Sequence, residues 1–185
     1  MSFDFKVVVA GPFAAGKTTL IRASSDIELV GTEAPTSGPE SSVKAMTTVG
    51  MEYGTLTFEG GAFRAELRLY GVPGQERFSF MWDIVAVGMD GLFVLVDASR
   101  PETWPESAAV ARHFARISAA PAVIGVNHRT GQSVDQLLPD IEAALGLDNP
   151  HLVPFDVMDR NASRDAIVEL LIDILHSEPA QGLAA

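Results

Sequence analysis

The nine residues "GPFAAGKTT", Gly11 to Thr19, follow the apolar run "FKVVVA" of residues 5–10 and open a helical pattern at 17–24. They fit the P-loop pattern, in which glycines let the backbone wrap around phosphates and the amides point inward. The lysine of this pattern supplies a point charge, and the next hydroxyl can bind Mg²⁺. A chance match in a chain of this size occurs on the order of once in a hundred sequences. We therefore expect a nucleoside triphosphate to bind with Mg²⁺. The expected contacts are Gly11, Phe13, Ala14, Ala15, Gly16, Lys17, Thr18 and Thr19.

The rest of the chain alternates short apolar runs with helical patterns, which predicts an α/β fold of the P-loop NTPase kind. Gly60-Gly61 suits a tight hairpin, so one strand of a six-stranded, mostly parallel sheet should be antiparallel, with about five helices on both faces. Ser133 and Asn161 precede the last two helical patterns. The further strands are expected at 51–58, 63–70, 91–98, 121–127 and 151–156, and the further helices at 80–89, 103–117, 134–145 and 162–176.

Composition narrows the classes of partner. With 24 acidic and 13 basic side chains the formal charge is -11, which disfavours a nucleic-acid surface. The absence of cysteine excludes disulfides, thiolate zinc sites and prenylation, and the longest apolar run, "GLFVLV", is too short to span a bilayer. We expect one cytoplasmic domain over 1–176, a flexible tail over 177–185 and no stable membrane anchor. Residues 25–47, rich in glycine, proline, serine and threonine, are expected to form a functional or disordered loop.

Two further stretches occur in the order used by Ras-like small GTPases. "TTVGMEYG" resembles the end of switch I and "GVPGQERF" resembles switch II. The resemblance covers about 5–175 and implies that Thr48 closes over Mg²⁺ beside Thr18, that the Gly74 amide lies near the γ-phosphate, and that Gln75 orients the attacking water. Gln75 and Lys17 would then be the catalytic residues. Two loops, about 25–50 and 71–82, would be ordered by the terminal phosphate of GTP and released after hydrolysis to GDP.

Within that superfamily the chain resembles bacterial branches, the Mgl-type GTPases of gliding motility and the GTP-binding proteins of actinobacterial conservon operons. Their switch II often reads V-P-G-Q, as residues 72–75 do here. This likeness implies a small roadblock-type regulatory partner.

The chain departs from the family pattern at the metal. Gly71 stands where most of the superfamily has an aspartate that holds Mg²⁺ through water, and weaker metal affinity is expected because Thr18, Thr48 and the phosphates remain. Asp97, after the apolar run "LFVLV", is an alternative anchor for the metal. The competing interpretation is that Asp97 caps the turn that follows it.

It also departs at the catalytic and base-reading motifs. Phe13 adds bulk where glycine is usual, Lys44 is the basic residue of switch I, and Arg77 is not at a usual finger position, so unaided hydrolysis should be slow. In "NHRT", Asn127 fits the base-reading motif and His128 could stack on the base, but Thr130 cannot accept two hydrogen bonds as an aspartate does, which should weaken guanine selectivity. Backbone amides of the last loop, at Val157 and Met158, are expected near the base.

Three hypotheses follow from these motifs. The first is a regulatory GTPase with slow turnover that signals to a partner. The second is an ATP-using P-loop phosphotransferase, favoured by Thr130. The third is a nucleotide-binding scaffold without hydrolysis, favoured by Gly71 and Phe13. Four scattered histidines show no metal-ligand spacing.

Overall fold

The computed structural model describes residues 1–31, 33–35, 46–48, 50–61, 63–128 and 133–177. Its main sheet has six strands in the order β4-β5-β1-β6-β7-β8, and β4 is antiparallel to β5 while the other pairs are parallel. The predicted fold class is therefore confirmed. The strands of this sheet are β1 (Ser2–Ala10), β4 (Glu52–Gly60), β5 (Phe63–Gly71), β6 (Gly91–Asp97), β7 (Ala122–Asn127) and β8 (His151–Phe155).

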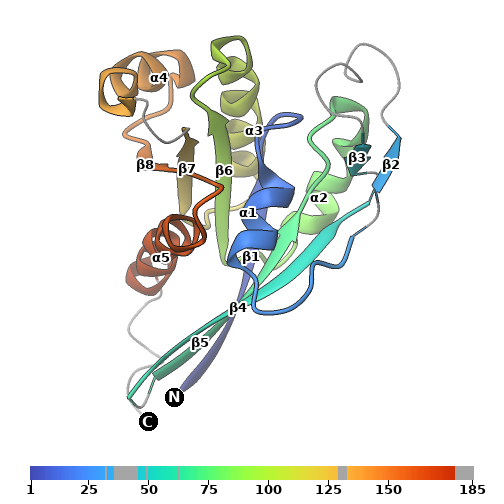
Figure 1. Cartoon of the computed structure of the whole chain (residues 1–185), viewed down its shortest axis with the longest axis vertical. Helices are drawn as coiled ribbons and strands as arrows, with labels where there is room; N and C mark the ends of the chain where they lie inside the picture. The colour runs from blue at the N-terminus through green and yellow to red at the C-terminus, as the bar shows by residue number, and fades with distance from the viewer. Residues whose placement is uncertain (32, 36–45, 49, 62, 129–132, 178–185) are drawn as a thin grey trace.

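In the part of the chain that the structure describes, five α-helices cover the two faces of the sheet. Figure 1 shows α1 and α5 in front of the sheet and α3 behind it. Crossovers between parallel strands place helices on both faces, as expected for this strand order. The helices are α1 (Lys17–Ser24), α2 (Phe80–Ala86), α3 (Trp104–Ile117), α4 (Leu138–Leu145) and α5 (Arg160–Ser177).

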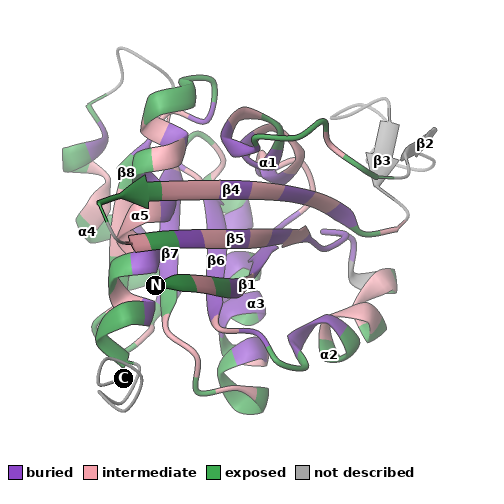
Figure 2. Ribbon diagram, turned by 90° about the horizontal axis from the view of Figure 1, so that it is seen from below, coloured by how far each residue is buried: buried purple, intermediate pink, exposed green. Residues whose placement is uncertain are grey.

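Alternation along the strands divides the core into two layers. Val7 and Val9 of β1 face α1 and α5, while Val8 and Ala10 face α2, α3 and α4, and all four are fully buried. Side chains of successive strand residues point to opposite faces, so a strand buried on both sides must be apolar throughout. In Figure 2 the inner strands β6 and β7 are accordingly buried along most of their length.

The helix boundaries differ from the prediction in three places. Residues 134–145 form a short 3-10 helix over 134–136 followed by α4, which has Pro139 in its first turn, instead of one continuous helix. Helix α2 ends at Ala86 rather than at residue 89. Helix α5 begins at Arg160, and Asp159 caps it by accepting hydrogen bonds from the amides of Asn161 and Ala162 at 2.8 and 3.2 Å.

The loop predicted over residues 25–47 contains two strands that sequence reasoning missed. Strands β2 (Glu33–Pro35) and β3 (Met46–Thr48) pair as a two-stranded antiparallel sheet apart from the main one. Runs of three residues are too short to show a periodic pattern. The structure does not describe 36–45, which includes Lys44, or the tail 178–185.

Parallel topology brings the chemically interesting loops to one edge. The carboxyl ends of β1, β6, β7 and β8 lie at the same edge, and β5, parallel to β1, ends there at Gly71. Ligands of open α/β sheets bind outside this edge. Among the described residues, no helix combines the length and the apolar character that crossing a membrane requires.

Candidate nucleotide site

The loop of residues 11–19, hereafter the cradle, joins β1 to α1 through an unusual backbone path. Gly11 (φ 138°), Ala14 (φ 62°) and Gly16 (φ 109°) all have positive φ. A side chain on Gly11 would bring its Cβ to 2.8 Å from the carbonyl oxygen of Leu95, so glycine is required there. This path turns the chain sharply into the N-terminus of α1, where unpaired amides attract phosphate.

Lys17 is held inside the cradle. Its side chain is 8% exposed, and Nζ donates hydrogen bonds to the carbonyl oxygens of Gly11 at 2.9 Å and of Pro12 at 2.6 Å. An ammonium group has three N–H donors, and these bonds fix its position without neutralising its charge. The lysine predicted from the P-loop pattern therefore lies inside the loop that joins β1 to α1.

The segment of residues 71–82, hereafter the second switch segment, lies against this lysine. Gly74 is buried, and a Cβ built on it would lie 2.7 Å from the carbonyl carbon and oxygen of Pro12 and closer still to Lys17 Nζ. No other residue type would fit at 74 without displacing the segment. The structure thus brings together Lys17 and Gly74, two residues that the sequence predicted near the γ-phosphate.

Gln75, the predicted water-orienting residue, lies next to this contact. Its side chain is 3% exposed, and its Oε1 accepts a hydrogen bond from Arg77 Nη2 at 2.7 Å. A second arginine approaches the cradle from the loop after β6, where Arg100 Nη1 donates to the carbonyl oxygen of Phe13 at 3.2 Å. Two cations therefore lie around the predicted reaction centre, although neither is in switch I.

Thr18 follows the lysine on α1. Its hydroxyl donates a short hydrogen bond of 2.5 Å to the Glu52 carboxylate, which is 2% exposed. Hydroxyl and carboxylate oxygens are the ligands that Mg²⁺ prefers, so these side chains fit that ion. Thr48, the other predicted metal ligand, ends β3 opposite Glu33, and the position of its side chain lies outside the described part of the structure.

Asn127 links the base-reading side of the site to the cradle. Its Nδ2 donates to the carbonyl oxygen of Ala15 at 3.3 Å, and its Oδ1 accepts from the amide of Val157 at 3.2 Å. A Cβ on Gly16 would lie 3.2 Å from Asn127 Nδ2, so the turn and the asparagine are closely packed. One side chain thus joins the ends of β1 and β7 to the loop after β8.

The structure describes some, but not all, of the other residues that the sequence predicted near the base. The His128 amide donates to the Phe155 carbonyl at 3.0 Å, while Met158 is 78% exposed and its amide donates to Asp156 Oδ1 at 2.9 Å. A base using the Val157 or Met158 amide would share or replace these bonds. Thr130 lies outside the described residues.

Asp97 forms hydrogen bonds within the turn that follows it, as the second interpretation of the sequence predicted. Its Oδ1 accepts hydrogen bonds from the amide and the hydroxyl of Ser99 at 2.9 and 2.6 Å. These contacts support the capping interpretation. Around the whole site, the described residues contain no group of three or more His, Cys, Asp or Glu side chains that could hold a metal ion.

The start of the predicted first switch segment, residues 25–50, is fastened at Asp26. Arg164 of α5 donates to Asp26 Oδ1 at 2.8 Å, and the Thr57 amide donates to Oδ2 at 2.7 Å. Partial burial raises the pKa of Asp26, but the bonds from Thr57 and Arg164 outweigh it, so the pKa lies below the ordinary 3.8. On the adjoining strand, burial and the nearby Tyr70 raise the pKa of Tyr53.

Sequence reasoning missed Glu52, Arg100 and the Arg77–Gln75 bond. Glu52 lies within "TTVGMEYG", but the sequence indicated no role for it, because its importance depends on its partner across the sheet, Gly71. The sequence located the hairpin but not its register: the observed pairing of Gly60 with Phe63 places 52 opposite 71, whereas a turn centred on Gly60-Gly61 would place 52 opposite 69. No local pattern indicates where the long Arg100 side chain ends.

Sheet order, cradle and lysine together define an α/β protein of the P-loop NTPase-like fold class. No family model matches the chain. Over 97 residues, 52% of this chain and 53% of the relative, it is 33% identical to the uncharacterized protein MJ1339 of Methanocaldococcus jannaschii. Over 110 residues, 60% of this chain and 53% of the relative, it is 28% identical to intraflagellar transport protein 22 of Chlamydomonas reinhardtii. The chain spans about half the length of these curated relatives.

Proposed function

We propose that this chain is a guanine-nucleotide switch that binds GTP and GDP with Mg²⁺, hydrolyses GTP slowly, and signals through residues 25–50 and 71–82 to a partner protein. The observation that carries the proposal is the contact between Gly74 and the buried Lys17. It places the second switch segment directly on the group that binds the terminal phosphates of a P-loop ligand. Gain or loss of a γ-phosphate at this position would move the segment.

The residues have separate tasks in this mechanism. The amides of the cradle and Lys17 bind the phosphates, and the Thr18 hydroxyl holds Mg²⁺, which neutralises charge that develops on the phosphate oxygens. Asn127 keeps the cradle and the base loop at a fixed spacing. Gln75 orients a water molecule whose oxygen attacks the γ-phosphorus as the bond to the bridging oxygen breaks, giving GDP and phosphate.

Slow turnover is expected because Gln75 begins in a bond to Arg77 and because Phe13 stands where efficient members of the resembling family have glycine. The water-orienting amide must leave its guanidinium partner before it can reach a water at the phosphate. A regulatory protein that captured Arg77, or that contributed a cation of its own, would accelerate the step, and such cations are worth about 10³ to 10⁵ in rate.

An exposed apolar stripe supports the signalling half of the proposal. Phe80, Ile84 and Val87 are 62, 67 and 74% exposed, and their spacing along and just beyond α2 places them on one side of the helix. The stripe begins within the second switch segment at Phe80 and continues just beyond it, so movement at Gly74 would carry it along. A roadblock-type partner, which the resemblance implies, is proposed to bind here.

The decisive experiment identifies the nucleotide that copurifies with the protein and measures affinities for GTP, GDP and ATP with and without Mg²⁺. The proposal expects a guanine nucleotide and tighter binding of GTP than of ATP, with the difference reduced because Thr130 lacks the two acceptors of an aspartate. Preference for ATP would overturn it in favour of an ATP-directed P-loop protein.

The bond between Gln75 and Arg77 also favours a second candidate, a nucleotide-binding scaffold that does not hydrolyse GTP. The substitution Gln75→Leu separates the two. A switch loses at least tenfold in turnover measured with its partner, whereas equal and near-zero turnover in both forms would identify a scaffold.

A further inference from the structure

Glu52 and Gly71 face one another across the sheet. Glu52 is the first residue of β4, Gly71 is the last residue of β5, and the two are directly paired in the antiparallel register. Side chains of directly opposite residues lie on the same face of a sheet, close enough to exchange roles. A carboxylate that is absent from position 71 can therefore be supplied from position 52.

The space beside Gly71 is filled by the Glu52 side chain. A Cβ built on Gly71 would lie 2.9 Å from Glu52 Oε2 and 3.2 Å from Glu52 Cβ, with Ile21 Cδ1 also too close at 2.6 Å. Gly71 has no positive φ, so its backbone conformation does not require glycine. The glycine is explained by the Glu52 carboxylate and the end of the Ile21 side chain, which together occupy the place where its side chain would be.

The same carboxylate holds the predicted metal ligand. Thr18 donates its proton to Glu52 Oε1 at 2.5 Å, so the lone pairs of the Thr18 oxygen remain available to a cation. A carboxylate in this position also accepts hydrogen bonds from water molecules bound to Mg²⁺, an ion that keeps several waters in protein sites. Such supporting partners typically change metal affinity by about 10- to 100-fold.

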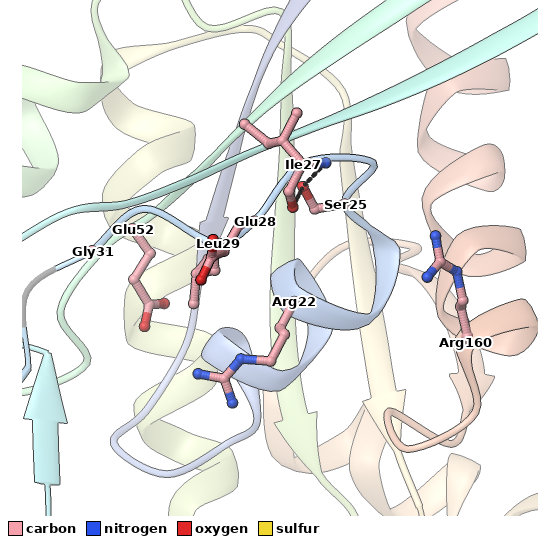
Figure 3. Close-up of a pocket in the computed structure, with 8 residues that line it drawn as sticks. All are labelled: Arg22, Ser25, Ile27, Glu28, Leu29, Gly31, Glu52 and Arg160. Carbon is pink, nitrogen blue, oxygen red and sulfur yellow. Dashed lines mark hydrogen bonds between the residues drawn. The ribbon is translucent and has the colours of Figure 1, made fainter.

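A cavity borders the nearly buried Glu52 side chain. Glu52 lines a cavity of about 550 Å³ between α1, the chain of residues 27–31 and the start of α5. In Figure 3 the Glu52 side chain extends from β4 beside Gly31, on the same side of the pocket as Arg22. A Cβ on Gly31 would lie 3.1 Å from Glu52 Cγ, so the beginning of the first switch segment packs over the glutamate.

We propose that Glu52 is the carboxylate of the Mg²⁺ site, holding Thr18 directly and the metal through bound water, in place of an acidic residue at 71. This inference rests on the proposed nucleotide function. It replaces the expectation of weak metal affinity, which considered Gly71 without its neighbour, and it makes Glu52 a positioning residue rather than a catalytic one.

The test measures dissociation of a fluorescent GDP analogue over a titration of free Mg²⁺. Glu52→Gln keeps an acceptor for Thr18 but removes the charge, and we expect the Mg²⁺ concentration that gives half-maximal slowing to rise about tenfold or more. Glu59→Gln is the matched control, since Glu59 lies on the same strand with a side chain 70% exposed. An unchanged Mg²⁺ requirement in Glu52→Gln would overturn the inference.

Moving the carboxylate from position 52 to position 71 gives an independent test if Glu52→Gln fails to fold. In the double variant Glu52→Ala, Gly71→Asp, removal of the glutamate carboxylate frees part of the space beside 71. The flexible end of Ile21, whose Cδ1 would lie 2.6 Å from the new Cβ, must also shift to admit the aspartate. We expect the wild-type Mg²⁺ requirement to return, while Gly71→Asp alone unfolds at a lower temperature because two carboxylates meet. A folded double variant that still needs about tenfold more Mg²⁺ would contradict the proposal.

These outcomes are distinct from failure of the proposed function. If the wild-type protein bound no guanine nucleotide at any Mg²⁺ concentration, the switch itself would be wrong. If the wild-type protein bound nucleotide in a Mg²⁺-dependent way, and the Glu52 variants had the same Mg²⁺ requirement, the proposed switch would stand and only the role of Glu52 would be refuted.

Discussion

The cradle and the second switch segment lie against each other but are stabilised in different ways. Bonds from Lys17 and Asn127 fix the cradle from within and from the neighbouring strand. The second switch segment is fastened by the Arg77–Gln75 bond and by Trp82 Nε1, which donates to the Pro73 carbonyl at 3.3 Å. Helix α2, which begins at the end of this segment, exposes apolar side chains. In the proposed switch the rigid part would bind the nucleotide and the lightly held part would respond to it.

Removal of the cradle's charge should have the largest effect. Lys17→Ala deletes the buried ammonium group, and loss of charge-assisted bonds to phosphate should weaken nucleotide binding about a hundredfold or more. Lys6→Ala is the control, because Lys6 bonds to the Val87 carbonyl away from the cradle. Equal affinities of these two variants in equilibrium titration would show that phosphate binds elsewhere.

Asn127→Ala should damage the cradle from outside. Two hydrogen bonds disappear, and the Val157 amide loses its acceptor. We expect a loss of about 2 kcal/mol in the free energy of unfolding and a roughly tenfold loss in nucleotide affinity. Chemical denaturation and titration measure the two quantities, with Asn161→Ala near the start of α5 as the control. A stability loss without any change in affinity would mean that the link is only structural.

Gly74→Ala tests the contact between the two regions. Its methyl group would collide with the Pro12 backbone, which cannot move as a flexible side chain can. We expect the second switch segment to detach, so that hydrogen exchange over 71–87 becomes fast and no longer depends on whether GDP or GTP is bound. Gly60→Ala is a matched control because nothing lies within 4 Å of its added methyl. A Gly74→Ala protein with wild-type nucleotide-dependent protection would refute the coupling.

Arg77→Ala should have a smaller effect than the preceding variants, and it should raise the rate of hydrolysis instead of impairing function. Gln75 loses the guanidinium that holds its Oε1, and one hydrogen bond of about 1 kcal/mol corresponds to roughly a fivefold change in population. Single-turnover hydrolysis without a partner should therefore become about two- to fivefold faster. A slower reaction would instead assign Arg77 to charge stabilisation at the phosphate.

The smallest expected effect is the pH dependence of stability that arises from Asp26. Because its pKa is lowered in the folded protein, this carboxylate stabilises the fold at neutral pH, and the contribution is lost as pH falls below about 3.8. Asp26→Asn should lower Tm slightly at pH 7, and its difference from wild type should shrink toward pH 3. Arg164→Gln should give a similar, non-additive loss. A Tm difference that stayed constant down to pH 3 would exclude the ionised carboxylate as its source.

Much of the fold and part of the site were predictable from sequence. Buried parallel strands read as continuous apolar runs, so "GLFVLV" located β6, and a local motif located Lys17 and Thr18. Glu52 and Arg100 escaped because their contacts join residues 34 and 87 positions apart. Such pairs depend on strand register and on the reach of long side chains, which neither periodicity nor motif spacing encodes.

The contact between Gly74 and Lys17 also bears on how affinities are to be interpreted. If phosphate binds this amine as proposed, it would have to displace the glycine, and only molecules in which residues 73–75 had moved would be ready to bind. Observed dissociation constants exceed the intrinsic one by the inverse of that fraction, and a ready fraction of about 1% would weaken apparent binding about a hundredfold. A partner that lifted residues 73–75 would then load the protein with nucleotide without touching the nucleotide itself.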